Sequence, residues 1–444
     1  MTHGRTRIKL YNPISGNIAR DIVSENTFQG SVISEGLRNL GYGKASLYNT
    51  PNSSLPPFTE IVGGILLLNK NDMPANSRFV PLGYSMTGNG AYGITNNDEP
   101  IELGSFDDQS SPITISDKKI TMTYQYTRSQ AIGDIGCVCL TSRTGGYIGI
   151  GNKNNKRTST VWDLHKNAGL TNICPQKGIG VDNPNNVVCN GAIYNFALSG
   201  DVLTVKKRRV PLKNASLLDC IEETKTFSVT SLQYSSFGTV LNVSASNGKI
   251  YISPTGFLRV GTTYIWCYDT ATELTPTLIT IEDTRNYEAY NGAYVCHDKA
   301  YIHNSDTGAF EVYELNGTHY HTIVAGVGTG GFSDNKAGEL GNHVLLQWRD
   351  EDWTRKCYLY DSQLNTALEI NAKDEISNLQ NLCLVEEETS KALCYVTASG
   401  ANPTFQGAYA FNNPFYLATI NNLPSVETKT TALAMTVEYT LTES

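Results

Sequence analysis

Two segments near opposite ends of the chain alternate apolar and polar residues with a period of two. They span residues 120–127 and 434–441. This period is typical of antiparallel strands that bury one face and expose the other. A further strand is predicted at 135–141, directly after the turn signal Gly133-Asp134. The sequence therefore predicts an all-β protein in which residues 58–152 form a β-sandwich.

The second alternating segment is expected to join that sandwich. Residues near a chain end usually fray unless a sheet holds them. Segment 434–441 stays regular almost to the last residue and repeats the pattern of 120–127. We therefore expect residues 414–444 to complete the sandwich, with the long region between the two parts forming an inserted domain.

The inserted region, residues 190–413, carries a weak repeat. Aromatic or aliphatic strand endings followed by Asp or Asn recur at 264–269, 301–306, 357–361 and 408–412. Their spacing lies near the roughly 40 to 50 residues of one four-stranded propeller blade, so the region is predicted to be a β-propeller-like domain of about five blades. The similar segments 191–196 and 407–412 suggest one blade completed from both ends. A long β-sandwich would give a similar spacing of strand endings and is the alternative fold.

Residues 1–57 are predicted to form an N-terminal arm with little core of its own. The apolar residues between Ile22 and Leu40 have a loosely helical spacing that several glycines interrupt. So weak a helix would not stay ordered alone, and the arm is expected to pack on a second subunit or another protein. Residues 153–189, rich in Asn, Lys, Gly and Pro, are predicted to be a connector.

Uncharged polar residues take the place of charged ones over much of the chain. Charged residues make up 17% of it, below the roughly 25% of an average soluble domain. Such surfaces suit coverage by neighbouring subunits, where a buried charge would be costly. The net charge is −8 and the only compact basic run is 206–209. No nucleic-acid partner is therefore expected, and a solvated strand end is the simpler interpretation of the run.

The longest apolar run, residues 61–68, is far shorter than the ~20 residues of a membrane helix. It predicts a buried central strand and no membrane partner. The N-terminus has no apolar segment of the kind that secretory signals carry. Of ten cysteines only Cys137 and Cys139 are close in sequence, and free thiols fit a reducing cytoplasm best.

Four segments resemble virion proteins of phages and prophages of Gram-positive bacteria. They are residues 137–142, 145–152, 417–423 and 435–442. Proteins of this kind are described as tail fibre, appendage or structural components. The resemblance implies a virion component that is made and assembled in the host cytoplasm. Its implied partners are other virion proteins and further copies of itself in a symmetric assembly, and it implies no catalytic residues.

Two histidines, His319 and His321, share one face of a predicted strand and have a spacing that suits a metal. His303 or Asp306 would have to supply a third ligand. Two surface histidines are the simpler interpretation, so neither a metal nor a cofactor is predicted. Likewise, an ordinary hairpin turn explains residues 305–310 better than a sialidase-type turn does.

The segment 348–353 combines two tryptophans with three acids. Trp348, Trp353 and Asp352 are the candidate residues for contact with a glycan. Glycoside hydrolases use a pair of carboxylates as catalytic groups, and the two must face each other across a cleft. Acids within one turn point in different directions, so a solvated hairpin is the alternative interpretation.

The sequence hypothesis is a non-enzymatic structural protein of the bacteriophage virion. The protein would be a fibre or adaptor component of the tail, the baseplate or the neck. A head-borne fibre is also compatible with this hypothesis. The projecting propeller would bind host surface glycans. The alternative hypothesis is a virion-associated glycoside hydrolase that acts on cell-wall polysaccharide, with Asp350 and Asp352 as its candidate acids.

Overall fold

The computed structural model is almost entirely antiparallel β-structure, which confirms the predicted all-β class. The residues that it describes are 2–27, 59–96, 101–111, 113–114, 118–148, 186–190, 192–209, 222–230, 241–254, 261–283, 292–304, 307–323, 336–349, 355–370, 379–383, 391–397, 406–412 and 416–443. The chain divides into two compact units, one made of residues 1–163 and 412–444 and the other of 164–411. Within the described ranges, no helix has the length and apolar character to cross a membrane.

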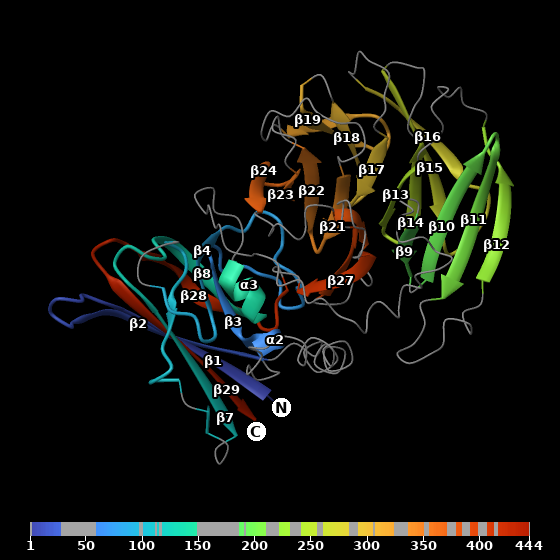
Figure 1. The fold of residues 1–444 in the computed structure, drawn as a ribbon. Helices are drawn as coiled ribbons and strands as arrows, with labels where there is room; N and C mark the ends of the chain where they lie inside the picture. The colour runs from blue at the N-terminus through green and yellow to red at the C-terminus, as the bar shows by residue number, and fades with distance from the viewer. Residues whose placement is uncertain are drawn as a thin grey trace. The chain divides into compact units, whose positions relative to one another are not determined.

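Where the structure describes it, the first unit is built on two antiparallel sheets (Figure 1). One has the order β2 (Ile18–Thr27), β1 (Thr2–Tyr11), β29 (Ala434–Glu443), β7 (Lys119–Tyr126) and β5 (Ser105–Phe106), with β6 (Ile113–Thr114) also paired to β7. The other has the order β28 (Asn421–Lys429), β8 (Gly133–Thr141), β3 (Gly64–Leu68) and β4 (Met86–Ala91). Two short helices accompany them, α2 (Thr59–Val62) and α3 (Arg143–Ile148).

One hydrophobic core lies between these two sheets. Alternate residues of β29 and β7 enter it, as the period of two predicts, and residues of β3 and β8 enter it from the other side. The buried members from these four strands are Met435, Val437, Tyr439, Leu441, Met122, Tyr124, Tyr126, Ile65, Leu67, Ile135, Val138 and Leu140. The last strand pairs with β7, as expected, with Val437 opposite Tyr124. The inner strand β3 is buried along its whole length, which confirms the strand expected there, although Ile61 and Val62 belong to α2.

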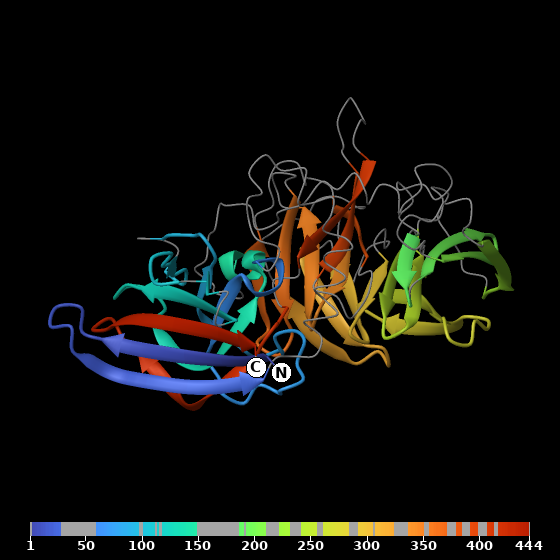
Figure 2. The same cartoon turned by 90° about the horizontal axis from the view of Figure 1, so that it is seen from below.

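The expectation of an N-terminal arm without a core is wrong for residues 2–27. These residues form the hairpin β1–β2, and β1 lies between β2 and β29 (Figures 1 and 2). Ile22 lies in β2 and not in a helix. Ile8 and Leu10 are each only 1% exposed, so the hairpin contributes to the core. The remainder of the expected arm, 28–57, lies outside the described residues.

Among its described residues, the second unit contains five antiparallel sheets, each made of strands that follow one another in sequence. The first sheet comprises β9 (Asn186–Cys189), β10 (Ala192–Ser199), β11 (Val202–Arg209) and β12 (Glu222–Ser228). The second comprises β13 (Leu241–Ser246), β14 (Lys249–Pro254), β15 (Thr262–Asp269) and β16 (Thr277–Glu282). The third comprises β17 (Ala293–Cys296), β18 (Lys299–Asn304), β19 (Ala309–Glu314) and β20 (His319–Ile323). The last two are β21 (Lys336–Leu340), β22 (His343–Arg349), β23 (Arg355–Asp361) and β24 (Thr366–Ile370); and β25 (Leu379–Cys383), β26 (Lys391–Thr397) and β27 (Gln406–Asn412).

The first strands of these sheets contact one another in a closed circuit. β9 contacts β13, β13 contacts β17, β17 contacts β21, β21 contacts β25, and β25 contacts β9. Two hydrogen bonds between the second and third sheets show that their first strands, β13 and β17, run in the same direction. Ser244 bonds to Val295 and Ser246, two residues further on, bonds to Asp298. Each sheet therefore packs on the next around a common centre.

Three sequence expectations for this unit need correction. Residues 301–304 of the segment 301–306 fall on the second strand of their sheet, whereas the other three repeated endings fall on third strands, which explains the uneven spacing. β10 and β27 belong to different sheets, so no blade is shared between them; instead the contact of β25 with β9 closes the circuit. Residues 186–189 of the expected connector form strand β9. The rest of that connector lies outside the described residues.

Candidate binding pocket

The structure places only part of the predicted glycan site. Trp348 lies on β22 opposite Lys356 of β23. The next pair, Arg349 and Arg355, is the last of this ladder, so the chain between them joins two paired strands. Asp352 and Trp353 belong to that connection and lie outside the described residues, as does Asp350.

The predicted histidine pair does not converge on a common point. The Nε2 atom of His319 lies 2.9 Å from Oε2 of Glu311. The ring of His321 instead makes an edge-to-face contact with the ring of Tyr320, at a centroid distance of 4.1 Å. His303 is buried against the ring of Phe310. In the parts of the chain that the structure describes, no three His, Cys, Asp or Glu side chains are grouped so as to hold a metal.

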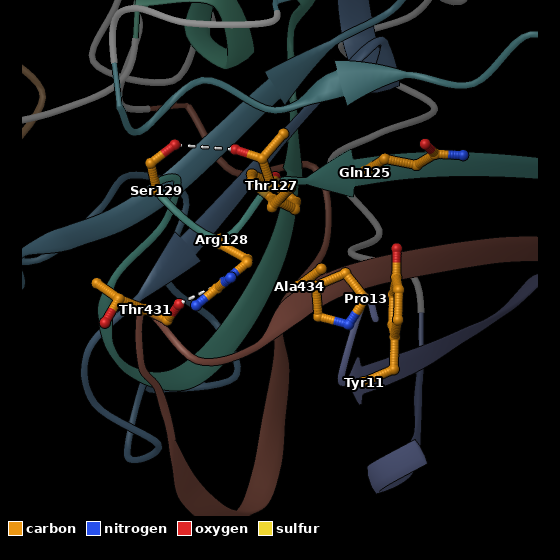
Figure 3. A pocket seen from close by; sticks show the side chains of 9 residues that line it. Tyr11, Pro13, Gln125, Thr127, Arg128, Ser129, Thr431 and Ala434 are labelled. Carbon is orange, nitrogen blue, oxygen red and sulfur yellow. Dashed lines mark hydrogen bonds between the residues drawn. The ribbon is translucent and has the colours of Figure 1, made fainter. Parts of the chain in front are cut away.

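A pocket of about 690 Å³ lies at one end of the first sheet of the first unit (Figure 3). Three chain reversals meet there, namely those between β1 and β2, between β7 and β8, and between β28 and β29. Its lining residues are Tyr11, Pro13, Gln125, Tyr126, Thr127, Arg128, Ser129, Thr431 and Ala434. A volume of this size is within the range of sites for small organic ligands.

The reversal between β1 and β2 has a well-defined shape. Asn12 accepts hydrogen bonds at Oδ1 from the backbone N–H groups of Ile14 and Ser15, at 2.9 and 3.2 Å. Its carbonyl accepts the N–H of Gly16, whose φ of 70° favours glycine. This turn holds Pro13 beside Tyr11 at the rim of the pocket (Figure 3).

The reversal between β7 and β8 supplies most polar groups of the pocket. Arg128 donates from Nε to the carbonyl oxygen of Thr431 at 2.9 Å, which ties this reversal to the one between β28 and β29. The hydroxyl oxygens of Thr127 and Ser129 lie 3.1 Å apart (Figure 3). The backbone N–H of Thr127 donates to Oε1 of Gln130 at 2.9 Å.

A buried lysine fixes this same reversal from inside the unit. Lys429 is 0% exposed, and its ammonium donates to the carbonyl oxygens of Thr127 at 2.9 Å and Gln130 at 2.6 Å. Burial lowers the pKa of Lys429 to about 8. The Gln130 side chain in turn donates to the carbonyl of Leu103 at 2.9 Å. The polar wall of the pocket is therefore held rigidly from behind.

The amide of Gln125 is also held in place. Its Nε2 donates to Oδ2 of Asp107 at 2.7 Å. Asp107 also accepts a hydrogen bond from the hydroxyl of Ser110, and this bond is the main cause of its lowered pKa. Gln125 thus keeps a fixed position on the outer face of β7, with its amide bound to an ionised partner.

The lining residues include one arginine, three residues with aliphatic hydroxyl groups and one glutamine, together with two tyrosines and a proline. Such a lining offers contacts for a polar ligand that also has an apolar face. This pocket could not be predicted from the sequence, because its residues come from three turns separated by more than a hundred positions. The one available signal was the turn composition at 12–17, where Asn, Pro, Ser and Gly gather.

No protein-family model matches the chain, and no curated protein matches it. Among solved structures, TolB from Acinetobacter baumannii is similar over 97% of this chain and 75% of its own, with 9% identity and a TM-score of 0.33. GH43B of a Bacteroides ovatus xyloglucan locus matches 56% of this chain with 11% identity and a TM-score of 0.33, and this chain spans 58% of its length. The SapL1 lectin, solved with alpha methyl fucoside, matches 55% of this chain and 80% of its own at 10% identity and a TM-score of 0.32. The chain's own residues therefore carry the functional proposal.

Proposed function

We propose that this protein is a structural and binding component of a bacteriophage virion, built as a β-sandwich that carries an inserted five-bladed β-propeller. The observation that supports this most is the pairing of β8 with β28, in which Val138 lies opposite Asn421. The chain leaves the first unit after α3, which follows β8, and returns to it shortly before β28. A whole domain is thus inserted between two hydrogen-bonded neighbours, so a complete sandwich can be held by a particle while the inserted domain binds elsewhere.

The outer face of the first sheet is the surface that we propose for contact with other subunits. Thr121 and Thr440 face each other across β7 and β29, with their hydroxyl oxygens 3.2 Å apart. Thr123, also on β7, donates from its hydroxyl to the carbonyl of Ser110 at 3.0 Å. These three threonines are already buried within the chain, whereas the exposed part of the same face carries the ion pair between Arg7 and Asp21. A partner that covers this face would have to match those charges. We propose other virion proteins and further copies of this chain as its partners.

The inserted unit is proposed to contact glycans of the host surface. Trp348 and the connection that follows it, with Asp352 and Trp353, remain its candidate residues. This connection joins the second and third strands of the fourth sheet. Because strands alternate in direction, it lies at the same end of the sheet as the connection to the next sheet. Residues from several sheets would meet at that end.

The test is mass spectrometry of phage particles purified through a density gradient. Peptides of this chain should co-purify with the major capsid protein at a constant ratio across the gradient. Their absence from infectious particles would refute the virion role. Electron microscopy of particles with a label on this chain would then show its position. Release of reducing sugar from cell-wall polysaccharide, lost in Asp352→Asn, would instead support the glycoside hydrolase.

A further inference from the structure

We infer that the pocket between the three reversals of the first unit binds an acidic saccharide, with a sugar carboxylate on Arg128 and the sugar ring against Tyr11. This site is distinct from the glycan contact proposed for the inserted unit. It stands on the pocket alone and does not depend on the virion role. Its residues all belong to the first unit.

Arg128 provides the cationic group for a carboxylate. Its Nε is already bound to the carbonyl of Thr431, which fixes the plane of the guanidinium. Within the described residues, no acceptor of its terminal amino groups is found. A planar guanidinium held in this way binds a carboxylate through two parallel hydrogen bonds, and it loses little conformational freedom on binding.

Tyr11 and Pro13 provide a flat apolar wall on the opposite part of the lining (Figure 3). Tyr11 lies at the end of β1 and pairs with Ala434, whose small side chain leaves the face of the sheet open beside it. The C–H groups of a pyranose ring pack well on such a surface. An aromatic ring has only two side-chain torsions to fix, so this contact carries a small entropic cost.

Hydroxyl and amide groups complete the match to a sugar. Thr127 and Ser129 each offer a group that both donates and accepts, and Gln125 offers an amide. Sugar hydroxyls need partners of both kinds. A peptide carboxylate would use the guanidinium but would leave these hydroxyls with less to bind, so the lining favours a saccharide. Lys429 holds the backbone of the same reversal, so the site is largely formed before the ligand arrives.

The experiment is calorimetric titration of the full chain with tetragalacturonate and, separately, with its methyl ester. The ester keeps the ring shape but removes the negative charges. We expect binding of the acid to be at least tenfold tighter than that of the ester. Equal binding of the two, or no binding of either at millimolar concentration, would overturn the inference. Tighter binding of a short peptide carboxylate would also overturn it.

Two variants tie the binding to this pocket. Arg128→Met removes the guanidinium and keeps the aliphatic stem, and should weaken binding of the acid by roughly tenfold to a hundredfold. Arg5→Met, on an exposed side chain of β1 outside the pocket, is the matched control and should leave binding unchanged. Equal losses in both variants would indicate a general charge effect and would reject the site. Thermal unfolding of both variants would verify that they are folded.

Discussion

The hydroxyl of Ser244 accepts the backbone N–H of Val295 at 2.8 Å, and this bond joins two neighbouring sheets of the second unit. Ser253 repeats the arrangement, because its hydroxyl accepts the N–H of Ala293 at 2.9 Å and donates to the carbonyl of Tyr264. The strand β17 pairs with β18 on one side only. Serine side chains of the preceding sheet therefore satisfy N–H groups on its other edge, which would otherwise be buried without partners.

Replacing Ser244 with alanine should lower the free energy of unfolding of the second unit by about 1 to 3 kcal/mol. The reason is that the N–H of Val295 would be left buried without an acceptor. Urea denaturation followed by the near-ultraviolet signal of Trp266, which is 1% exposed in this unit, would measure the change. Ser199→Ala, on the exposed end of β10, is the control and should change stability by less than ~0.5 kcal/mol. Equal effects of the two substitutions would contradict the role of the bond.

Ile8→Ala should destabilise the first unit by about 2 to 5 kcal/mol, because Ile8 is 1% exposed and belongs to the core between the two sheets. Val23→Ala, on the adjacent strand β2 where the side chain is 41% exposed, should have little effect. Denaturant midpoints of the two variants provide the measurement. A small loss for Ile8→Ala would instead support an N-terminal segment that contributes nothing to the core.

Gly146→Ala should destabilise the first unit by at least ~1 to 3 kcal/mol. Gly146 lies in α3, and a Cβ added there would overlap with the backbone of Gly90 and Gly64, which cannot move aside as a flexible side chain would. Gly16→Ala is a useful contrast, since a Cβ at that position meets no atom and only its φ of 70° opposes the change. Thermal unfolding should show a much larger loss for Gly146→Ala. Similar melting temperatures would show that α3 can shift away from the sheet.

Lys429 should make the stability of the first unit depend on pH between about 8 and 10.5. Its pKa is lowered to about 8 from 10.5, so in this window the unfolded chain binds more protons at this group than the folded chain does. Stability from this group therefore rises as the pH increases through the window. The rise is absent below pH 8, where the lysine is protonated in both states.

Denaturation of the native chain and of Lys429→Met at several pH values from 7 to 10 would test this. The difference in unfolding free energy between the two should grow in favour of the native chain as the pH rises. Lys119→Met, at an exposed position of β7, is the control and should show no such trend. A difference that stays constant with pH would mean that Lys429 keeps an ordinary pKa.

The strand pattern of the first unit was accessible from sequence because it is local. Side chains of a strand point alternately to its two faces, so one buried face leaves a period of two in the sequence. The alternation of 434–441 and 120–127 identified two strands that do pair, as β29 and β7. The apolar run at 61–68 likewise located the buried strand β3.

The features that could not be predicted from the sequence depend on pairing between strands that are far apart in the chain. The strand β1 shows the same alternation, with Ile8 and Leu10 directed inward on either side of Lys9, but two large apolar residues are too few to reveal the period. Its register against β29 depends on a strand more than four hundred residues away. Likewise, no local pattern distinguishes the second strand of a sheet from the third, so the repeat at 301–306 was assigned to the wrong position.

By itself, the sequence determined that this chain is built of antiparallel strands, because alternation and turn composition are properties of neighbouring residues. Only the tertiary structure decided which turns meet at the pocket of Tyr11 and Arg128, and that Lys429 is buried beneath it. These contacts join residues through space, and their energy depends on desolvation and on the geometry of distant partners. Neither the desolvation nor this geometry can be recognised from the spacing of residues along the chain.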